Sequence, residues 1–118
     1  MGFTLGRRAR GRTRHEPGRM NKMEAEYAGI LDVRRQAGEV AGYWFESLKL
    51  RLADRTWYSI DFLVMLADGS LEVHEVKGFM EDDAAAKLKV AASQYPLFPF
   101  ILVTRRGGKW SFATVSAN

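Results

Sequence analysis

The sequence contains no cysteine among its 118 residues, which excludes disulfide scaffolds, thiolate zinc sites and cysteine nucleophiles. Its two histidines, His15 and His74, are too dispersed for the ligand spacing of a zinc site. The best apolar run, Leu97 to Val103, contains Pro99 and is far shorter than the roughly 18 apolar residues that span a membrane. With 47% hydrophobic residues, the chain has enough apolar material for one core. We therefore expect a single domain and no contact with a membrane.

The positive charge is concentrated at the N-terminus. Residues 1–20 contain six arginines and one acidic residue, Glu16, whereas the remaining 98 residues carry a net charge of −1. A segment rich in glycine and arginine, without hydrophobic periodicity, does not bury enough to order itself and suits a polyanion such as nucleic acid. We predict that residues 1–20 are a disordered basic arm that contacts DNA through Arg7, Arg8, Arg10, Arg12 and Arg14. A solvated tail and a targeting peptide are the alternatives. A secretory signal is disfavoured because no apolar segment follows the basic stretch.

The rest of the chain, residues 21–118, predicts one α/β domain. Asn21 and Glu24 form the pattern of a capping box, which begins a helix that ends at Gly38. Strand patterns follow at residues 43–52, 57–66 and 71–77, with turn residues between them, and indicate an antiparallel meander. A helix then begins at Asp82 or Asp83 and stops before Pro96, and two strands follow at residues 100–104 and 110–115. This order predicts a mixed central sheet with flanking helices.

The register between the second and third strands decides whether Asp61 and Glu75 meet. A three-residue turn over residues 67–69, with Gly69 in the left-handed conformation, pairs residues whose numbers sum to 136. Asp61 then faces Glu75, and Lys77 projects from the same side. A two-residue type I′ turn gives a sum of 137 instead and places Glu75 on the other face. Both registers are open at this point.

The first register brings two carboxylates and an ammonium group to the end of an apolar sheet face, which is costly unless something binds there. Mg²⁺ meets this requirement, because it takes oxygen ligands and is typically held by one or two carboxylates and a substrate phosphate. Asp61 and Glu75 are then candidate metal ligands, and Lys77 would orient or help to deprotonate an attacking water. Glu24 is the third carboxylate if its helix packs over the same face. The alternative is a surface cluster of acidic and basic side chains.

These residues carry a family resemblance. Asp61 on the second strand and Glu75-Val76-Lys77 on the third resemble the PD-(D/E)XK nuclease superfamily, and within it a small phage-type group similar to Holliday-junction resolvases. The similar segments lie between residues 21 and 104, at residues 21–24, 58–62, 74–78 and 87–96. Ile60 stands where the name of the superfamily expects proline.

The resemblance implies a restriction-endonuclease-like core and Mg²⁺-dependent hydrolysis of phosphodiester bonds in structured or branched DNA, with Mn²⁺ as a substitute metal. It makes Asp61 and Glu75 the metal ligands, Glu24 the carboxylate from the helix and Lys77 the residue that positions the nucleophile. It also implies a cytoplasmic location in a phage-infected or bacterial cell.

Further basic and aromatic residues suggest how DNA is held. Lys87 and Lys89 flank the apolar face of the second helix, where we expect phosphate contacts; lysine stems covering that apolar face are the alternative. Junction cleavage needs two symmetry-related cuts, so we expect a homodimer. The three tryptophans fall in strands and are assigned to the core or to a dimer surface. The rival hypothesis for the whole chain is a non-catalytic nucleic-acid-binding or phage assembly module, in which the carboxylates serve only structure.

Overall fold

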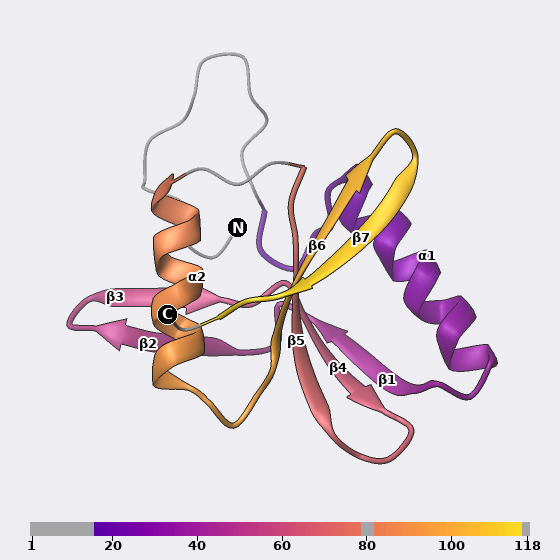
Figure 1. The fold of residues 1–118 in the computed structure, drawn as a ribbon, viewed down its shortest axis with the longest axis horizontal. Coiled ribbons are helices and arrows are strands. Elements are labelled where there is room, and N and C mark those ends of the chain that lie inside the picture. Colours follow the sequence, from indigo (N-terminus) through magenta and orange to yellow (C-terminus); the bar gives the residue numbers. More distant parts are fainter. Residues whose placement is uncertain (1–15, 79–81, 117–118) are drawn as a thin grey trace.

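The computed structural model describes residues 16–78 and 82–116 (Figure 1). The arginines predicted to contact DNA, Arg7 to Arg14, lie outside the described residues. The elements in chain order are α1 (Lys22–Gln36), β1 (Val40–Phe45), β2 (Lys49–Ala53), β3 (Thr56–Ser59), β4 (Phe62–Leu66), β5 (Leu71–Val76), α2 (Asp82–Gln94), β6 (Phe100–Arg106) and β7 (Lys109–Thr114). Of the helices in the described ranges, neither α1 nor α2 is long and apolar enough to cross a membrane.

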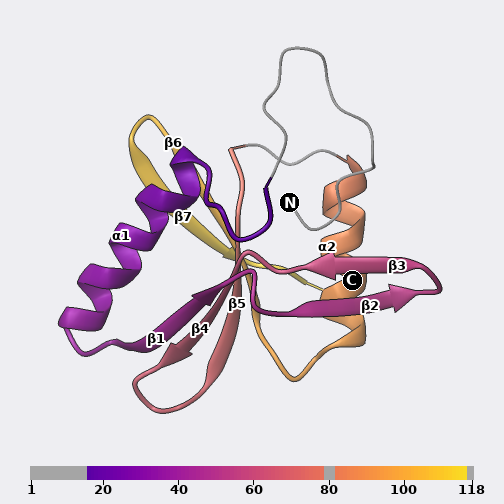
Figure 2. The same ribbon diagram turned by 180° about the vertical axis from the view of Figure 1, so that it is seen from behind.

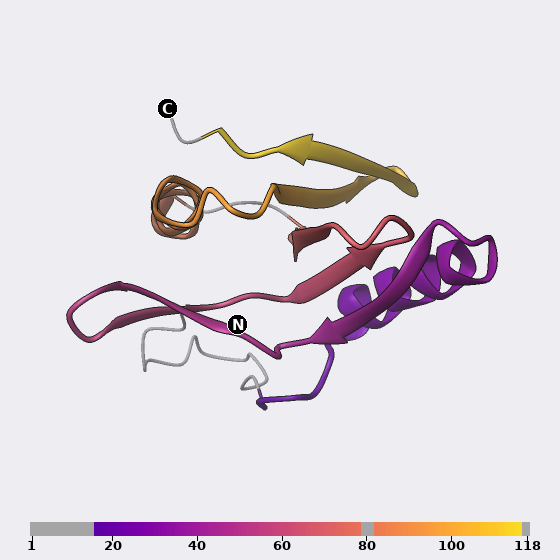
Figure 3. The same ribbon diagram turned by 90° about the horizontal axis from the view of Figure 1, so that it is seen from below.

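Five strands form one twisted mixed sheet in the order β1-β4-β5-β6-β7. β5 and β6 are parallel and are connected through α2, whereas the other neighbouring strands are antiparallel. β2 and β3 form a separate hairpin that extends away from this sheet (Figure 1, Figure 2). α1 and α2 lie on opposite sides of the sheet (Figure 3). The predicted α/β class, with a mixed sheet and two flanking helices, is confirmed.

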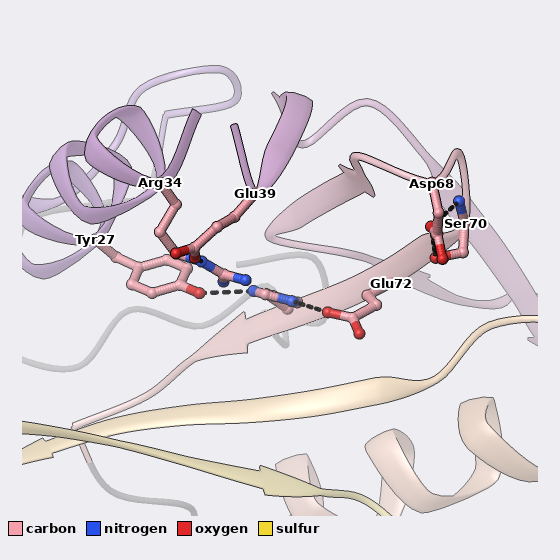
Figure 4. A network of polar contacts seen from close by, with 7 residues as sticks. Tyr27, Arg34, Glu39, Asp68, Ser70 and Glu72 are labelled. Carbon is pink, nitrogen blue, oxygen red and sulfur yellow. Dashed lines mark hydrogen bonds and ion pairs between the residues drawn. The ribbon is translucent and has the colours of Figure 1, made fainter. Parts of the chain in front are cut away.

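The turn between β4 and β5 fixes the register on which the candidate site depends. Gly69 has a φ of 89°, a left-handed conformation that glycine adopts without steric cost. Phe62 pairs with His74, and every pair between the two strands sums to 136. Asp68 supports the turn, since its Oδ1 accepts the backbone N–H and the hydroxyl of Ser70 at 2.9 and 2.6 Å (Figure 4). The turn therefore has three residues, and the observed register is the one that places Asp61 opposite Glu75.

Two of the predicted strands are broken. Residues 43–52 and 57–66 are each expected to be continuous, but the structure divides them into β1 and β2 and into β3 and β4, so that prediction is wrong. The pairing of β2 with β3 is shifted by one residue relative to that of β1 with β4. The bulge contains Glu46, which has a φ of 50° and whose N–H donates to the carbonyl oxygen of Asp61 at 2.8 Å. Bulges bend and twist a β-ribbon, which explains why the outer hairpin leaves the main sheet here.

The bend divides the core into two clusters. One lies between α1 and the sheet and contains Tyr27, Ala28, Leu31, Val40, Phe62, Val64, Val76 and Val103. The other joins α2, the β2–β3 hairpin and the opposite face of the sheet, and contains Leu50, Leu52, Tyr58, Ile60, Val73, Leu88, Ala91 and Phe100. Ile60 belongs to the second cluster and Phe62 to the first. The chain therefore passes from one core to the other at Asp61.

The start of α1 is held by the predicted capping box. Oδ1 of Asn21 accepts the backbone N–H of Glu24 at 2.8 Å, and Oε1 of Glu24 accepts the backbone N–H of Asn21 at 2.8 Å. Such a cap stabilises a helix by about 1 kcal/mol. Because Glu24 is itself part of the cap, the first turn of α1 also fixes the position of its carboxylate.

Residues 16–20, which precede α1, contact the domain at the bulge around Glu46. The backbone N–H of Gly18 donates to Oε1 of Glu46 at 2.7 Å, and Met20 packs against the core beneath α1. The described part of the predicted arm, residues 16–20, therefore contacts the segment that also bonds to Asp61.

Candidate functional site

Asp61 lies at the crossing between the two cores, immediately before β4. Its side chain is only 1% exposed, and its Oδ2 accepts the backbone N–H of Val76 on β5 at 2.9 Å. Its other oxygen, Oδ1, is also buried and has no hydrogen-bond partner within the described chain. Buried polar atoms are almost always paired, and leaving one unpaired costs about 1–3 kcal/mol, more for a charged group. Asp61 thus holds an unused acceptor in the interior.

Glu75 lies across from Asp61, one residue beyond the pair formed by Phe62 and His74. It is equally buried, and both of its oxygens are engaged. The Tyr58 hydroxyl donates to Oε1 at 2.5 Å, and the Lys77 ammonium lies 3.2 Å from Oε2. These contacts hold the Glu75 carboxylate in one orientation and keep a positive charge beside it.

The third carboxylate is that of Glu24, which is 1% exposed at the start of α1. Its negative charge raises the pKa of both Asp61 and Glu75, so it is close enough to interact with each of them. The four residues predicted to carry the chemistry come from α1, the approach to β4 and the end of β5. The expected packing of α1 over the sheet face of Glu75 is wrong, because α1 packs on the opposite face, against Phe62 and His74, and Glu24 approaches the site from the end of that helix. Their chemical roles stay predictions.

The crowding of carboxylates perturbs their titration. Burial raises the pKa of Asp61 well above its usual range, and the charges of Glu75 and Glu24 raise it further, while Lys77 opposes the shift. Burial also raises the pKa of Glu75, against the opposing effects of Lys77 and of the Tyr58 hydroxyl. A bound cation would favour the charged forms of both groups and so reverse these shifts. Perturbed carboxylates of this kind are a feature of functional sites.

The donor set fits a hard divalent cation with an incomplete protein ligand shell. As the side chains stand, the described residues include no group of three or more Asp, Glu or His that could hold a metal ion. Mg²⁺ needs fewer, because it keeps several waters and is often bound through one or two carboxylates and a substrate phosphate. Asp61 and Glu75 would supply the direct ligands, with the unpaired Oδ1 of Asp61 as the first of them. Glu24 uses Oε1 for its helix cap and would contribute its other oxygen or act through water.

A second polar network occupies the opposite face of β5 (Figure 4). The Tyr27 hydroxyl lies 2.7 Å from Nδ1 of His74, and Nε2 of His74 lies 2.8 Å from Oε1 of Glu72. Since a carboxylate only accepts, Nε2 carries the proton and Nδ1 accepts from the hydroxyl of Tyr27. Burial lowers the pKa of His74, although the carboxylate of Glu72 opposes this. In the observed register His74 points away from Asp61. Its two partners could not be predicted from the sequence, because they meet it only in the folded chain.

The other predicted contact residues are more scattered. Lys87 is half-buried on α2, whereas Lys89 is exposed, so the two do not share one environment. Arg105, near the end of β6, pairs with Glu26 on α1 and lies over the ring of Trp110 at 5.1 Å. Arg105 therefore serves to connect β6 to α1.

No family model, curated protein or solved structure matches this chain. Because an α/β class alone does not determine activity, the function is argued from the side chains of the site.

Proposed function

We propose that this protein is a Mg²⁺-dependent endonuclease that hydrolyses phosphodiester bonds in structured or branched DNA, as its resemblance to the PD-(D/E)XK nucleases implies. The observation that carries the proposal is the buried Oδ1 of Asp61, which has no hydrogen-bond partner among residues 16–78 and 82–116 and lies beside Glu75 and Lys77. Burying adjacent carboxylates destabilises the fold unless a cation or other partner compensates them. A ligand that binds these carboxylates would compensate the loss of stability, whereas a purely structural role would not.

Asp61 and Glu75 would hold Mg²⁺, which when bound would stabilise the charge that develops on the phosphate oxygens and lower the pKa of a coordinated water. Lys77 would donate a hydrogen bond from its ammonium group to the attacking water and align it with the phosphorus. A new bond forms between the water oxygen and phosphorus, and the bond from phosphorus to the departing sugar oxygen breaks. Solvent accepts the proton that the attacking water loses and supplies the proton that the departing sugar oxygen gains. Tyr58 keeps Glu75 oriented throughout.

Substrate affinity would come from groups outside this centre. The arm arginines, together with Lys87 and Lys89, would bind phosphates without reading sequence, so binding should weaken steeply with salt. A homodimer would place two such centres on a branched substrate, as two symmetry-related cuts require.

A cleavage panel tests the proposal. Labelled four-way junction, flap, single-stranded and linear duplex DNA would be incubated with the protein in Mg²⁺, Mn²⁺ or EDTA. The variants are Asp61→Asn and Lys77→Ala, with Glu39→Gln as a control that removes one negative charge from an exposed position. We expect metal-dependent cutting by the wild type and Glu39→Gln, and its loss in the other two with binding retained.

Two results would overturn the proposal. Cutting that persists in Asp61→Asn would place the activity elsewhere. Binding without cutting, unaffected by metal or by either substitution, would identify a non-catalytic nucleic-acid-binding module on this fold.

A further inference from the structure

The β2–β3 hairpin has two unlike faces. Its inner face carries Leu50, Leu52 and Tyr58, which are buried against α2. Its outer face carries Lys49, Arg51 and Trp57, all exposed. Arg51 pairs directly with Trp57 across the two strands, and Lys49 pairs with Ser59 one step further along. The outer face thus presents an aromatic ring beside two cations.

The exposure of Trp57 has no structural explanation within the described chain. The side chain is 47% exposed, and it belongs to neither core cluster. Trp57 therefore does not belong to the core, one of the two roles expected for it. Burial of a tryptophan is strongly favourable, so a half-exposed indole on a solvent-facing strand is available for a partner.

The charge around Trp57 indicates which partner fits. Lys49 and Arg51 lie on its face, and Arg55 lies in the turn two residues before it. The acidic residue nearby, Asp54, approaches Arg51 at 3.9 Å with both side chains exposed, a contact of little energetic weight. A flat aromatic surface among cations matches a polyanion that carries planar bases.

We infer that the outer face of the β2–β3 hairpin binds a nucleic-acid strand, with an unpaired base stacked on the indole of Trp57 and neighbouring phosphates bound by Lys49 and Arg51. This inference rests on the proposed function and adds to it the means by which branched DNA is selected. Duplex bases are stacked on each other, whereas a branch point, flap or single strand offers a base that is free to stack on the protein.

The hairpin connects this face to the candidate site. Tyr58, the residue after Trp57, points to the opposite side and donates to Glu75. Asp61 follows four residues after Trp57, so their Cα atoms are no more than about 13 Å apart at roughly 3.3 Å per residue. A strand held on Trp57 would therefore have its phosphates within a few nucleotides of the metal ligands. Figure 1 shows the hairpin extending beyond the sheet and crossing α2.

Binding in EDTA isolates this surface from catalysis. The full chain would be titrated against a labelled single-stranded oligonucleotide and against the duplex of the same sequence, with fluorescence anisotropy as the readout. The variants are Trp57→Ala, Trp57→Phe and the double change Lys49→Ala with Arg51→Ala. Trp44→Ala is the matched control: Trp44 is also 47% exposed, but its neighbours Gly42 on β1 and Leu63 on β4 carry no charge.

We expect Trp57→Ala to weaken single-strand binding by roughly 5- to 150-fold, the range measured for loss of one stacked base, with a smaller effect on the duplex. Trp57→Phe should retain most of the affinity, and Trp44→Ala should bind as the wild type does. The double change should reduce the slope of log affinity against log salt by about 1.4, because each phosphate contact contributes about 0.7 for a single strand. If Trp57→Ala does not fold, the salt slope of the double variant still tests whether this face binds nucleic acid.

Equal effects of Trp57→Ala and Trp44→Ala, or none from Trp57→Ala, would overturn the inference. So would a change in oligomeric state on size-exclusion chromatography without a change in binding, since Trp57 would then contact a second copy. These outcomes are separate from the test of the nuclease. Loss of Trp57-dependent binding with metal-dependent cutting intact removes only this inference, and Trp57-dependent binding without cutting removes only the nuclease.

Discussion

The hydroxyl of Tyr58 donates to Oε1 of Glu75 at 2.5 Å and joins the outer hairpin to the main sheet at the candidate site. Both side chains are buried, Tyr58 from β3 and Glu75 from β5. Hydrogen bonds to a carboxylate are shorter and stronger than those between neutral groups. This bond sets the orientation of Glu75 and leaves Oε2 beside Lys77. The hairpin is therefore a structural part of the site.

Tyr58→Phe removes this donor and keeps the ring. We expect the free energy of unfolding to fall by about 1–3 kcal/mol, because the buried carboxylate loses a partner. The pKa of Glu75 should rise further, so the acidic limb of the cleavage profile should move to higher pH. Urea unfolding and cleavage rates across pH measure the two effects.

Tyr43→Phe is the matched control for this change. Tyr43 donates to Asp32 at 2.8 Å and lies outside the candidate site, so its loss should cost stability without moving the cleavage profile. Identical pH profiles for Tyr58→Phe and the wild type would contradict the role assigned to Tyr58.

Local signals in the sequence limited the position of Glu75 relative to Asp61 to two registers but did not choose between them. Asp68 and Gly69 are compatible with a turn of two or three residues, and the structure has three, which sets the register of the whole hairpin. The capping box predicts the first turn of α1 and the position of Glu24 within it. Where α1 packs depends on tertiary contacts, and it covers the sheet face opposite Glu75.

The break between β3 and β4 could not be predicted in the same way. It depends on Glu46 at positive φ, a position with no glycine or asparagine to signal it. The apolar residues on both sides of Asp61 predict one continuous strand over residues 57–66. In the structure Ile60 and Phe62 instead face different core clusters. The bonds of Glu75 to Tyr58 and of His74 to Tyr27 likewise arise only when separate elements pack together.

The buried His74 predicts a loss of stability in mild acid. Burial lowers its pKa in the folded state from 6.5, so the unfolded chain binds the proton more tightly. The stability that this group contributes is present above about pH 6.5 and is lost as the pH falls through the folded-state pKa. His74→Gln should lower the free energy of unfolding at neutral pH by about 1–3 kcal/mol and remove this acid slope.

Urea unfolding at a series of pH values tests this, with His15→Gln as the control. Replacing the arm histidine should leave the acid slope of the wild type unchanged. Parallel curves for His74→Gln and the wild type would show that another group causes the acid response.

Deleting residues 1–15 should weaken DNA binding without abolishing cleavage. The deletion removes five arginines and keeps residues 16–20, including Gly18, which bonds to Glu46. If all five contact duplex phosphates, the slope of log affinity against log salt should fall by about 4.5, at roughly 0.9 per contact. Cleavage at saturating enzyme should continue. An unchanged affinity and salt slope in the shortened protein would show that the arm is a solvated tail.

Asp61→Asn should increase stability, or leave it unchanged, when no metal is present. The pKa of Asp61 is raised in the folded state, so its contribution to stability is fully present below its unfolded pKa of about 3.8 and is lost as the pH rises through the folded value. Toward neutral pH the wild type therefore loses stability through Asp61, whose buried Oδ1 has no hydrogen-bond partner among the described residues. Asparagine does not ionise and still offers an acceptor to the N–H of Val76.

Thermal melting in EDTA and in Mg²⁺ separates a ligand-binding Asp61 from a structural one. Mg²⁺ should raise the melting temperature of the wild type and of the surface control Asp54→Asn, because an ion that binds only the folded state stabilises it. It should have little effect on Asp61→Asn, which lacks a charged ligand. A variant that loses stability in EDTA at neutral pH, together with a wild type indifferent to Mg²⁺, would make Asp61 a structural residue and contradict the proposed metal centre.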